Sequence, residues 1–135
     1  MLLSNSTARV QIGRLGEFEL KPGYYIYIGS AFGPGGLRAR ISRHCRTDKP
    51  KYWHIDYLRE FVTPLTAWVS YGPERLEHRW AQVFYRLEET IPVQGFGCSD
   101  CKCHSHLFYA SNRPEFAHFS GMLGDQVEAW PCLLE

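Results

Sequence analysis

The sequence predicts one small α/β domain of the α+β type, with a mixed sheet covered by helices. Three observations support this prediction. The chain has 135 residues, which suits one domain with a single modest core. Segments rich in β-branched and aromatic residues alternate with segments of helical periodicity. The sequence contains neither an internal repeat nor a low-complexity tract, so one domain is expected over residues 1–135.

The N-terminal part of the chain is expected to form strands. Residues 1–14 fit a strand or hairpin, residues 16–20 alternate in polarity, and residues 21–23 (KPG) predict a turn. The next strand is the aromatic stretch GYYIYIG at 23–29. Its period of two places Tyr24, Ile26 and Ile28 on a core face and Tyr25, Tyr27 and Gly29 on the opposite face.

The glycine-rich residues 33–36 predict a loop that leads into the first helix, over 37–46. This helix has one narrow apolar stripe, formed by Leu37, Ile41 and Cys45. Arg40 and His44 lie along the edge of the stripe, whereas Arg43 points further outward. Because they border the core, Arg40 and His44 are expected to be held in place.

The second half of the chain continues the alternation. A second helix is expected over 53–61 and a strand over 65–71. Gly72-Pro73 opens a third helix over 74–89, because proline favours the first turn of a helix. Its core stripe contains Leu76, Trp80, Val83, Phe84 and Leu87, with Glu77 at the edge. A last strand at 106–110, a closing helix at 114–123 and a tail complete the chain.

Charge and composition indicate a cytoplasmic protein without a membrane segment. No apolar run approaches the ~18 residues of a membrane span, and residues 1–10 lack the pattern of a signal peptide. The net charge is only +1, but residues 1–60 carry +5 and residues 61–135 carry −4. Any binding of nucleic acid would therefore depend on a local basic patch.

Polar residues on three separate elements could carry chemistry, although each has an ordinary structural interpretation as well. Tyr27 is a strand aromatic that packs, or a phenol that exchanges a proton with a bound phosphate or water. Arg40, with His44 beside it, is either a solvent-exposed cation of a basic helix face or a planar guanidinium that binds phosphate. Glu77 is a surface carboxylate or the ligand of one Mg²⁺ or Mn²⁺ ion.

A cluster of cysteines and histidines occupies residues 96–106 (FGCSDCKCHSH). The chain has five cysteines, and three of them fall within residues 98–103, which favours reduced thiols or a metal over a secreted disulfide framework. A zinc site is one interpretation, and a tight loop of small buried thiols is the other. The candidate zinc ligands are Cys98, Cys101, Cys103 and His106, and Cys45 or His54 could supply a missing one.

Together these residues resemble the GIY-YIG nuclease superfamily. The YIG motif is Tyr27-Ile28-Gly29, and a loop and the helix LRARISRH follow it as in that superfamily. YIGSAFGPGGLRARISRH, WHIDYL and FGCSDCKCHSHLFY resemble in particular the compact branch of Uri-type endonucleases, once catalogued only as a domain of unknown function. The resemblance covers roughly residues 8–110, and residues 111–135 form a C-terminal extension.

The resemblance implies a three-stranded, mainly antiparallel sheet flanked by helices, and metal-dependent hydrolysis of nucleic acid, expected to be DNA. It implies that Glu77 binds the divalent ion, Arg40 neutralises the phosphate, Tyr27 orients or deprotonates the water, and His44 assists. Residues expected to contact substrate are Tyr25, Gly29, Ser30, Arg43 and His54.

One feature departs from the superfamily's pattern. The first motif should place a tyrosine on the strand before YIG, but no tyrosine precedes Tyr24, and the expected one would fall just upstream of Met1. Tyr25, on the same strand face as Tyr27, is a candidate substitute. Two alternatives therefore stay open: a nucleic-acid-binding module that does not cut, and a zinc-stabilised structural or interaction protein.

Overall fold

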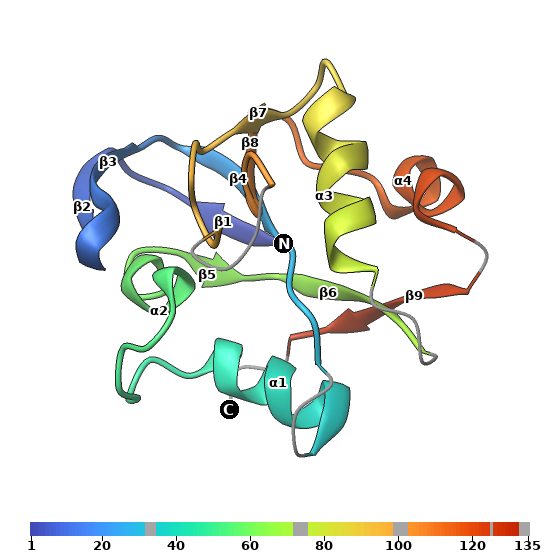
Figure 1. Ribbon diagram of the computed structural model, residues 1–135, viewed down its shortest axis with the longest axis horizontal. Coiled ribbons are helices and arrows are strands. Elements are labelled where there is room, and N and C mark those ends of the chain that lie inside the picture. Colours follow the sequence, from blue (N-terminus) through green and yellow to red (C-terminus); the bar gives the residue numbers. More distant parts are fainter. Residues whose placement is uncertain (32–34, 72–75, 99–102, 125, 133–135) are drawn as a thin grey trace.

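The computed structural model describes residues 1–31, 35–71, 76–98, 103–124 and 126–132. It confirms the predicted fold class, a mixed α/β architecture whose sheets are antiparallel (Figure 1). The main sheet is wider than the three strands expected, because two-residue strands pair with both of its edges. Its order is β5 (Thr63–Pro64), β1 (Leu2–Ser4), β4 (Gly23–Tyr27), β8 (Leu107–Ala110) and β7 (Ile91–Pro92).

Two smaller two-stranded sheets accompany the main sheet. The hairpin of β2 (Ala8–Ile12) and β3 (Gly16–Leu20) is joined by the 3-10 turn η1 (Gly13–Leu15). β6 (Thr66–Ser70) pairs with β9 (Val127–Pro131). The prediction of a tail after the last helix is therefore wrong in part, because residues 127–131 form strand β9, which pairs with β6.

Four helices are present among the described residues; the first has the predicted length but begins one residue earlier, and the other three are shorter than predicted. They are α1 (Gly36–Cys45), α2 (His54–Leu58), α3 (Glu77–Arg86) and α4 (Phe116–Leu123). The predicted start of the third helix at Gly72-Pro73 lies outside the described residues. None of these helices has the length and apolar character that crossing a bilayer requires.

The core lies on both faces of the central strand β4. On one face, the β2–β3 hairpin and α2 cover a cluster that contains Tyr25, Phe96 and Leu107. On the other face, α3 and α4 cover a cluster that contains Ile26, Ile28 and Phe108 (Figure 1). Because both faces are covered, no residue of β4 is exposed, whereas Gly29, two residues beyond the strand, is exposed.

This arrangement corrects the predicted faces of the aromatic strand. Ile26 and Ile28 are buried as expected, but Tyr24 is only half-buried. Tyr25, expected on the functional face, is 1% exposed and packs against Phe18 and Tyr109. The period of two is correct, but it could not indicate that the hairpin would cover the second face.

Candidate functional site

Helix α1 presents Arg40 and His44 one turn apart, on the side of the helix that faces the end of β4. The residue before the helix, Gly35, has a φ of +85°, a left-handed conformation that favours glycine. Arg40 Nε donates a hydrogen bond to His44 Nε2 over 3.0 Å. The Arg40 guanidinium also stacks on Trp53, with its carbon 3.8 Å from the ring centre. The guanidinium is therefore held by two contacts before any ligand binds.

The proton on His44 is fixed by the bond to Arg40. Because Nε2 accepts, the neutral ring carries its proton on Nδ1, which is buried and has no hydrogen-bond partner among the described residues. Burial, together with the nearby Arg40 and Lys49 cations, lowers the pKa of His44 to about 3. At neutral pH, His44 is thus an uncharged acceptor that orients Arg40.

Tyr27 and Arg40 converge at Gly29. A Cβ added at Gly29 would lie 3.4 Å from Tyr27 Cε2 and 3.8 Å from Arg40 Nη2. Burial raises the pKa of Tyr27, the Arg40 guanidinium opposes this shift, and the Glu77 carboxylate adds to it. The phenol of Tyr27 therefore stays protonated at neutral pH, next to a cation and within electrostatic reach of Glu77.

Two cavities meet along the segment that follows β4. Tyr27, Arg40 and His44 line one cavity of about 150 Å³, whose walls also include apolar side chains of α1 and β6. Glu77 lines the second, an open groove of about 410 Å³. Gly29 and Ser30 line both. The predicted catalytic residues thus lie around the YIG glycine, with Glu77 on the adjoining groove.

Glu77 is the first residue of α3, and its carboxylate faces two imidazoles. Its side chain is 21% exposed, with Oε1 3.8 Å from His78 Nε2 and Oε2 4.0 Å from His106 Nδ1. A partly exposed carboxylate can hold a divalent ion whose other ligands are water and substrate, so the position fits the predicted metal role. The neighbouring imidazoles make the surroundings richer in nitrogen donors than the sequence indicated.

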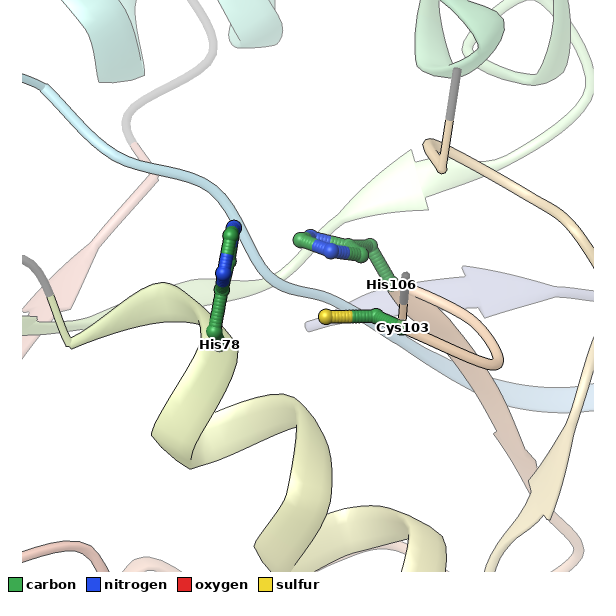
Figure 2. A group of neighbouring side chains, drawn as sticks. All are labelled: His78, Cys103 and His106. Carbon is green, nitrogen blue, oxygen red and sulfur yellow. The ribbon is translucent and has the colours of Figure 1, made fainter. Parts of the chain in front are cut away.

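Three of these neighbours form a candidate metal-binding cluster. The ligand atoms of His78, Cys103 and His106 all lie within 4.8 Å of one another. Figure 2 shows His78 on α3, with His106 and Cys103 directed toward it from the segment that leads into β8. Cys103 and His106 were predicted as metal ligands, and the structure brings them together.

The rest of the predicted zinc set differs from this cluster. Cys98 donates its thiol to the Phe96 carbonyl over 3.5 Å and does not belong to the cluster. Cys101 lies outside the described residues. His78 was missed because a histidine outside the apolar stripe of an amphipathic helix looks like a surface residue. Its only signal was its position next to Glu77.

Arg43, predicted to contact substrate, forms an ion pair instead. Its two terminal nitrogens donate to Asp56 Oδ1 and Oδ2, each over 2.8 Å, and Asp56 is 2% exposed. Although burial alone would raise the pKa of Asp56, hydrogen bonds from Arg43 and from the N–H groups of Trp53 and Tyr52 hold it well below its usual range. Arg43 and Asp56 therefore join α1 to α2.

Of the other residues predicted to contact substrate, Tyr25 and His54 bond to the backbone, whereas Ser30 lines both cavities. The hydroxyl of buried Tyr25 accepts a hydrogen bond from the Lys21 N–H over 3.0 Å, so this side chain does not reach the site. His54 Nδ1 accepts from the Gly97 N–H over 2.7 Å, and burial lowers its pKa. His54 thus anchors the loop before β8, while Ser30 is half-buried at the junction of the two cavities.

Arg59 is a further positioning residue that the sequence did not reveal. It is 7% exposed and donates from Nε to the His44 carbonyl over 2.8 Å and from Nη2 to the Cys45 carbonyl over 2.9 Å. A cation at the last carbonyls of a helix satisfies unpaired acceptors and complements the helix dipole. Arg59 therefore fixes the end of α1 that carries His44.

Fold and site together define a mixed α/β protein with an Arg–His–Tyr cluster where the central strand leaves the sheet. The chain belongs to the family described as domain of unknown function DUF123, whose sequence profile matches residues 1–127. Comparison with curated proteins and with solved structures gave no match.

Proposed function

We propose that this chain is a metal-dependent endonuclease that hydrolyses phosphodiester bonds of nucleic acid, with DNA as the expected substrate. The observation that carries the proposal is the convergence of Arg40 and Tyr27 on Gly29, with Glu77 on the adjoining groove. The order of these residues along the chain also resembles that of the GIY-YIG superfamily. A preorganised cation, a protonated phenol and a carboxylate suit phosphoryl transfer, where charge grows on the oxygens of the phosphate.

Each side chain has a role that follows from its surroundings. Arg40, held by His44 and Trp53, binds the scissile phosphate and stabilises the charge of the transition state. Tyr27 remains a phenol at neutral pH, so it orients the attacking water or a phosphate oxygen by hydrogen bonding rather than taking a proton. Glu77 would hold a divalent ion, Mg²⁺ or Mn²⁺, which when bound stabilises the leaving oxygen as a Lewis acid.

Labelled single-stranded, duplex and branched DNA, and matched RNA, test the proposal in the presence of Mg²⁺ or Mn²⁺. The expected result is cleavage of at least one substrate that requires the metal. Fluorescence anisotropy with the same substrates at several salt concentrations measures binding separately, since phosphate contacts make binding weaken as salt increases.

A nucleic-acid-binding module that does not cut is the second candidate function. It is favoured by one observation: Leu2 and Leu3 of β1 lie opposite Tyr25 and Tyr24, so the residues of β1 that pair with these tyrosines offer no phenol. Continuing this register by two residues would place a residue before Met1 opposite Tyr27. A chain preceded by Gly-Ala-Tyr therefore tests the idea: salt-sensitive binding by both forms, with cleavage only by the extended form, would support the module.

A further inference from the structure

We propose that His78, Cys103 and His106 supply three ligands of a zinc site built between α3 and the segment before β8. This inference does not depend on the proposed nuclease activity, because it concerns metal binding without nucleic acid. It also differs from the ligand set expected from the sequence, because among the described residues it includes His78 and leaves out Cys98.

The donor atoms define the class of metal. Two imidazoles and one thiolate suit borderline and soft ions such as Zn²⁺, whereas Mg²⁺ prefers oxygen ligands. Around one tetrahedral zinc ion, two nitrogens and one sulfur lie roughly 3.3–3.5 Å apart, given Zn–N of ~2.0 Å and Zn–S of ~2.3 Å. The three donor atoms lie within 4.8 Å of one another, so a contraction of at most about 1.5 Å would close the site. His78, whose side chain is 57% exposed, can supply this movement by rotating.

His106 is oriented as a metal-binding histidine usually is. It is 4% exposed, and its Nδ1 lies 3.2 Å from the Ile28 carbonyl oxygen. A proton on Nδ1 that is donated to this carbonyl leaves Nε2 as the ligand atom. The Ile28 N–H in turn donates to the His106 carbonyl over 2.9 Å, so the histidine is locked to the YIG strand.

Charge at the site favours a dication. The Cys103 thiolate and the Glu77 carboxylate together would balance the two charges of Zn²⁺. Glu77 lies 3.8 Å from His78 Nε2 and 4.0 Å from His106 Nδ1, where a carboxylate can support histidine ligands. Zinc takes four ligands, so water, a phosphate oxygen or a further side chain would complete the three donors of this cluster.

The site also borders the residues proposed to act on nucleic acid. A Cβ added at Gly97 would lie 3.0 Å from His106 Cβ and 3.8 Å from Tyr27 Cε1. The Tyr27 ring therefore has Arg40 near one edge, at Gly29, and the metal site near the other, at Gly97.

The test uses the full chain, stripped of metal under reducing conditions and titrated with Zn²⁺ or Co²⁺. Zinc affinity is measured by competition with a chromophoric chelator, and Cys103 ligation by the thiolate-to-cobalt charge-transfer band. We expect one ion per chain, at least about tenfold weaker zinc binding in His78→Ala, and loss of the cobalt band in Cys103→Ser. Because His78 is exposed, its substitution should leave the circular dichroism spectrum unchanged.

Two matched controls give the test its specificity. His104 is exposed and stacks on Tyr85, and Cys98 bonds to a backbone carbonyl, so His104→Ala and Cys98→Ser should bind zinc like the wild type. The proposal is overturned if the chain binds no zinc, if His78→Ala binds it with unchanged affinity, or if Cys98→Ser rather than Cys103→Ser removes the cobalt band.

Discussion

Arg40 Nε donates to His44 Nε2 over 3.0 Å, and this bond joins the proposed phosphate-binding group to a neutral imidazole. The imidazole accepts this hydrogen bond rather than donating it, so the role of His44 is to orient the Arg40 guanidinium. A side-chain amide oxygen can accept the same hydrogen bond. This relationship separates a positioning role for His44 from an acid–base role.

His44→Gln should therefore retain cleavage, while His44→Ala should lose about tenfold or more of kcat/KM through misplacement of Arg40. The measurement is steady-state cleavage of the best DNA substrate by the three proteins. A similar loss in both variants, together with a pH–rate limb near the ordinary histidine pKa that only the wild type shows, would indicate that His44 transfers a proton.

The buried imidazole should also make stability depend on pH. The pKa of His44 is about 3 in the folded chain and about 6.5 when unfolded. The unfolded state therefore binds the extra proton first, so this contribution is fully present above about pH 6.5 and is lost as the pH falls toward 3.

Urea unfolding at about pH 7.5 and about pH 4.5 measures this effect. Relative to His44→Gln, the wild type should lose up to about 1.4 kcal/mol per pH unit over this acidic range. Comparing the two proteins cancels the contribution of Asp56, which also favours folding above the ordinary carboxyl pKa. Parallel curves for the two proteins would show that His44 is not buried in its neutral form.

Asp56→Ala should destabilise the chain by about 3–5 kcal/mol, because it leaves the Arg43 guanidinium and two backbone N–H groups without their acceptor. The matched control is Glu17→Ala, which breaks an exposed pair with Arg9 at 3.8 Å and should change stability by less than about 0.5 kcal/mol. Both values come from denaturant unfolding, and equal effects would contradict a structural role for Arg43 and Asp56.

Gly29 should tolerate alanine but not a large side chain. Its φ is not in the left-handed region, and an added Cβ meets only ordinary contacts, so Gly29→Ala should fold normally. Gly29→Leu would extend toward the Tyr27 ring and Arg40 and should abolish cleavage. Gly97→Ala is the contrast, because its φ of +74° and a 3.0 Å contact should cost about 1–2 kcal/mol of stability. Undiminished cleavage by Gly29→Leu would place the reaction elsewhere.

The sequence revealed the parts of this site that local pattern controls. Gly29 lies two residues beyond the aromatic strand, which ends at Tyr27, and the spacing of Arg40 and His44 sets both on one edge of a helix. Residues whose role depends on distant partners were misjudged: the pattern could not show that a hairpin covers Tyr25. Arg43 was expected to contact substrate because its partner, Asp56, lies on another helix and the spacing of the sequence does not reveal their pairing. His78 became significant only when Cys103 and His106 were brought beside it.

The most direct measurement is metal-dependent cleavage by the wild type, Arg40→Ala and Glu77→Gln. The matched controls are Arg86→Ala and Glu88→Gln, which change exposed residues at the end of α3 and just beyond it. We predict cleavage by the wild type and both controls, and a loss of about a hundredfold or more in each site variant, with Glu77→Gln still binding DNA. Cleavage that survives in Arg40→Ala and Glu77→Gln, or its absence from the wild type with every metal and substrate, would contradict the proposed nuclease.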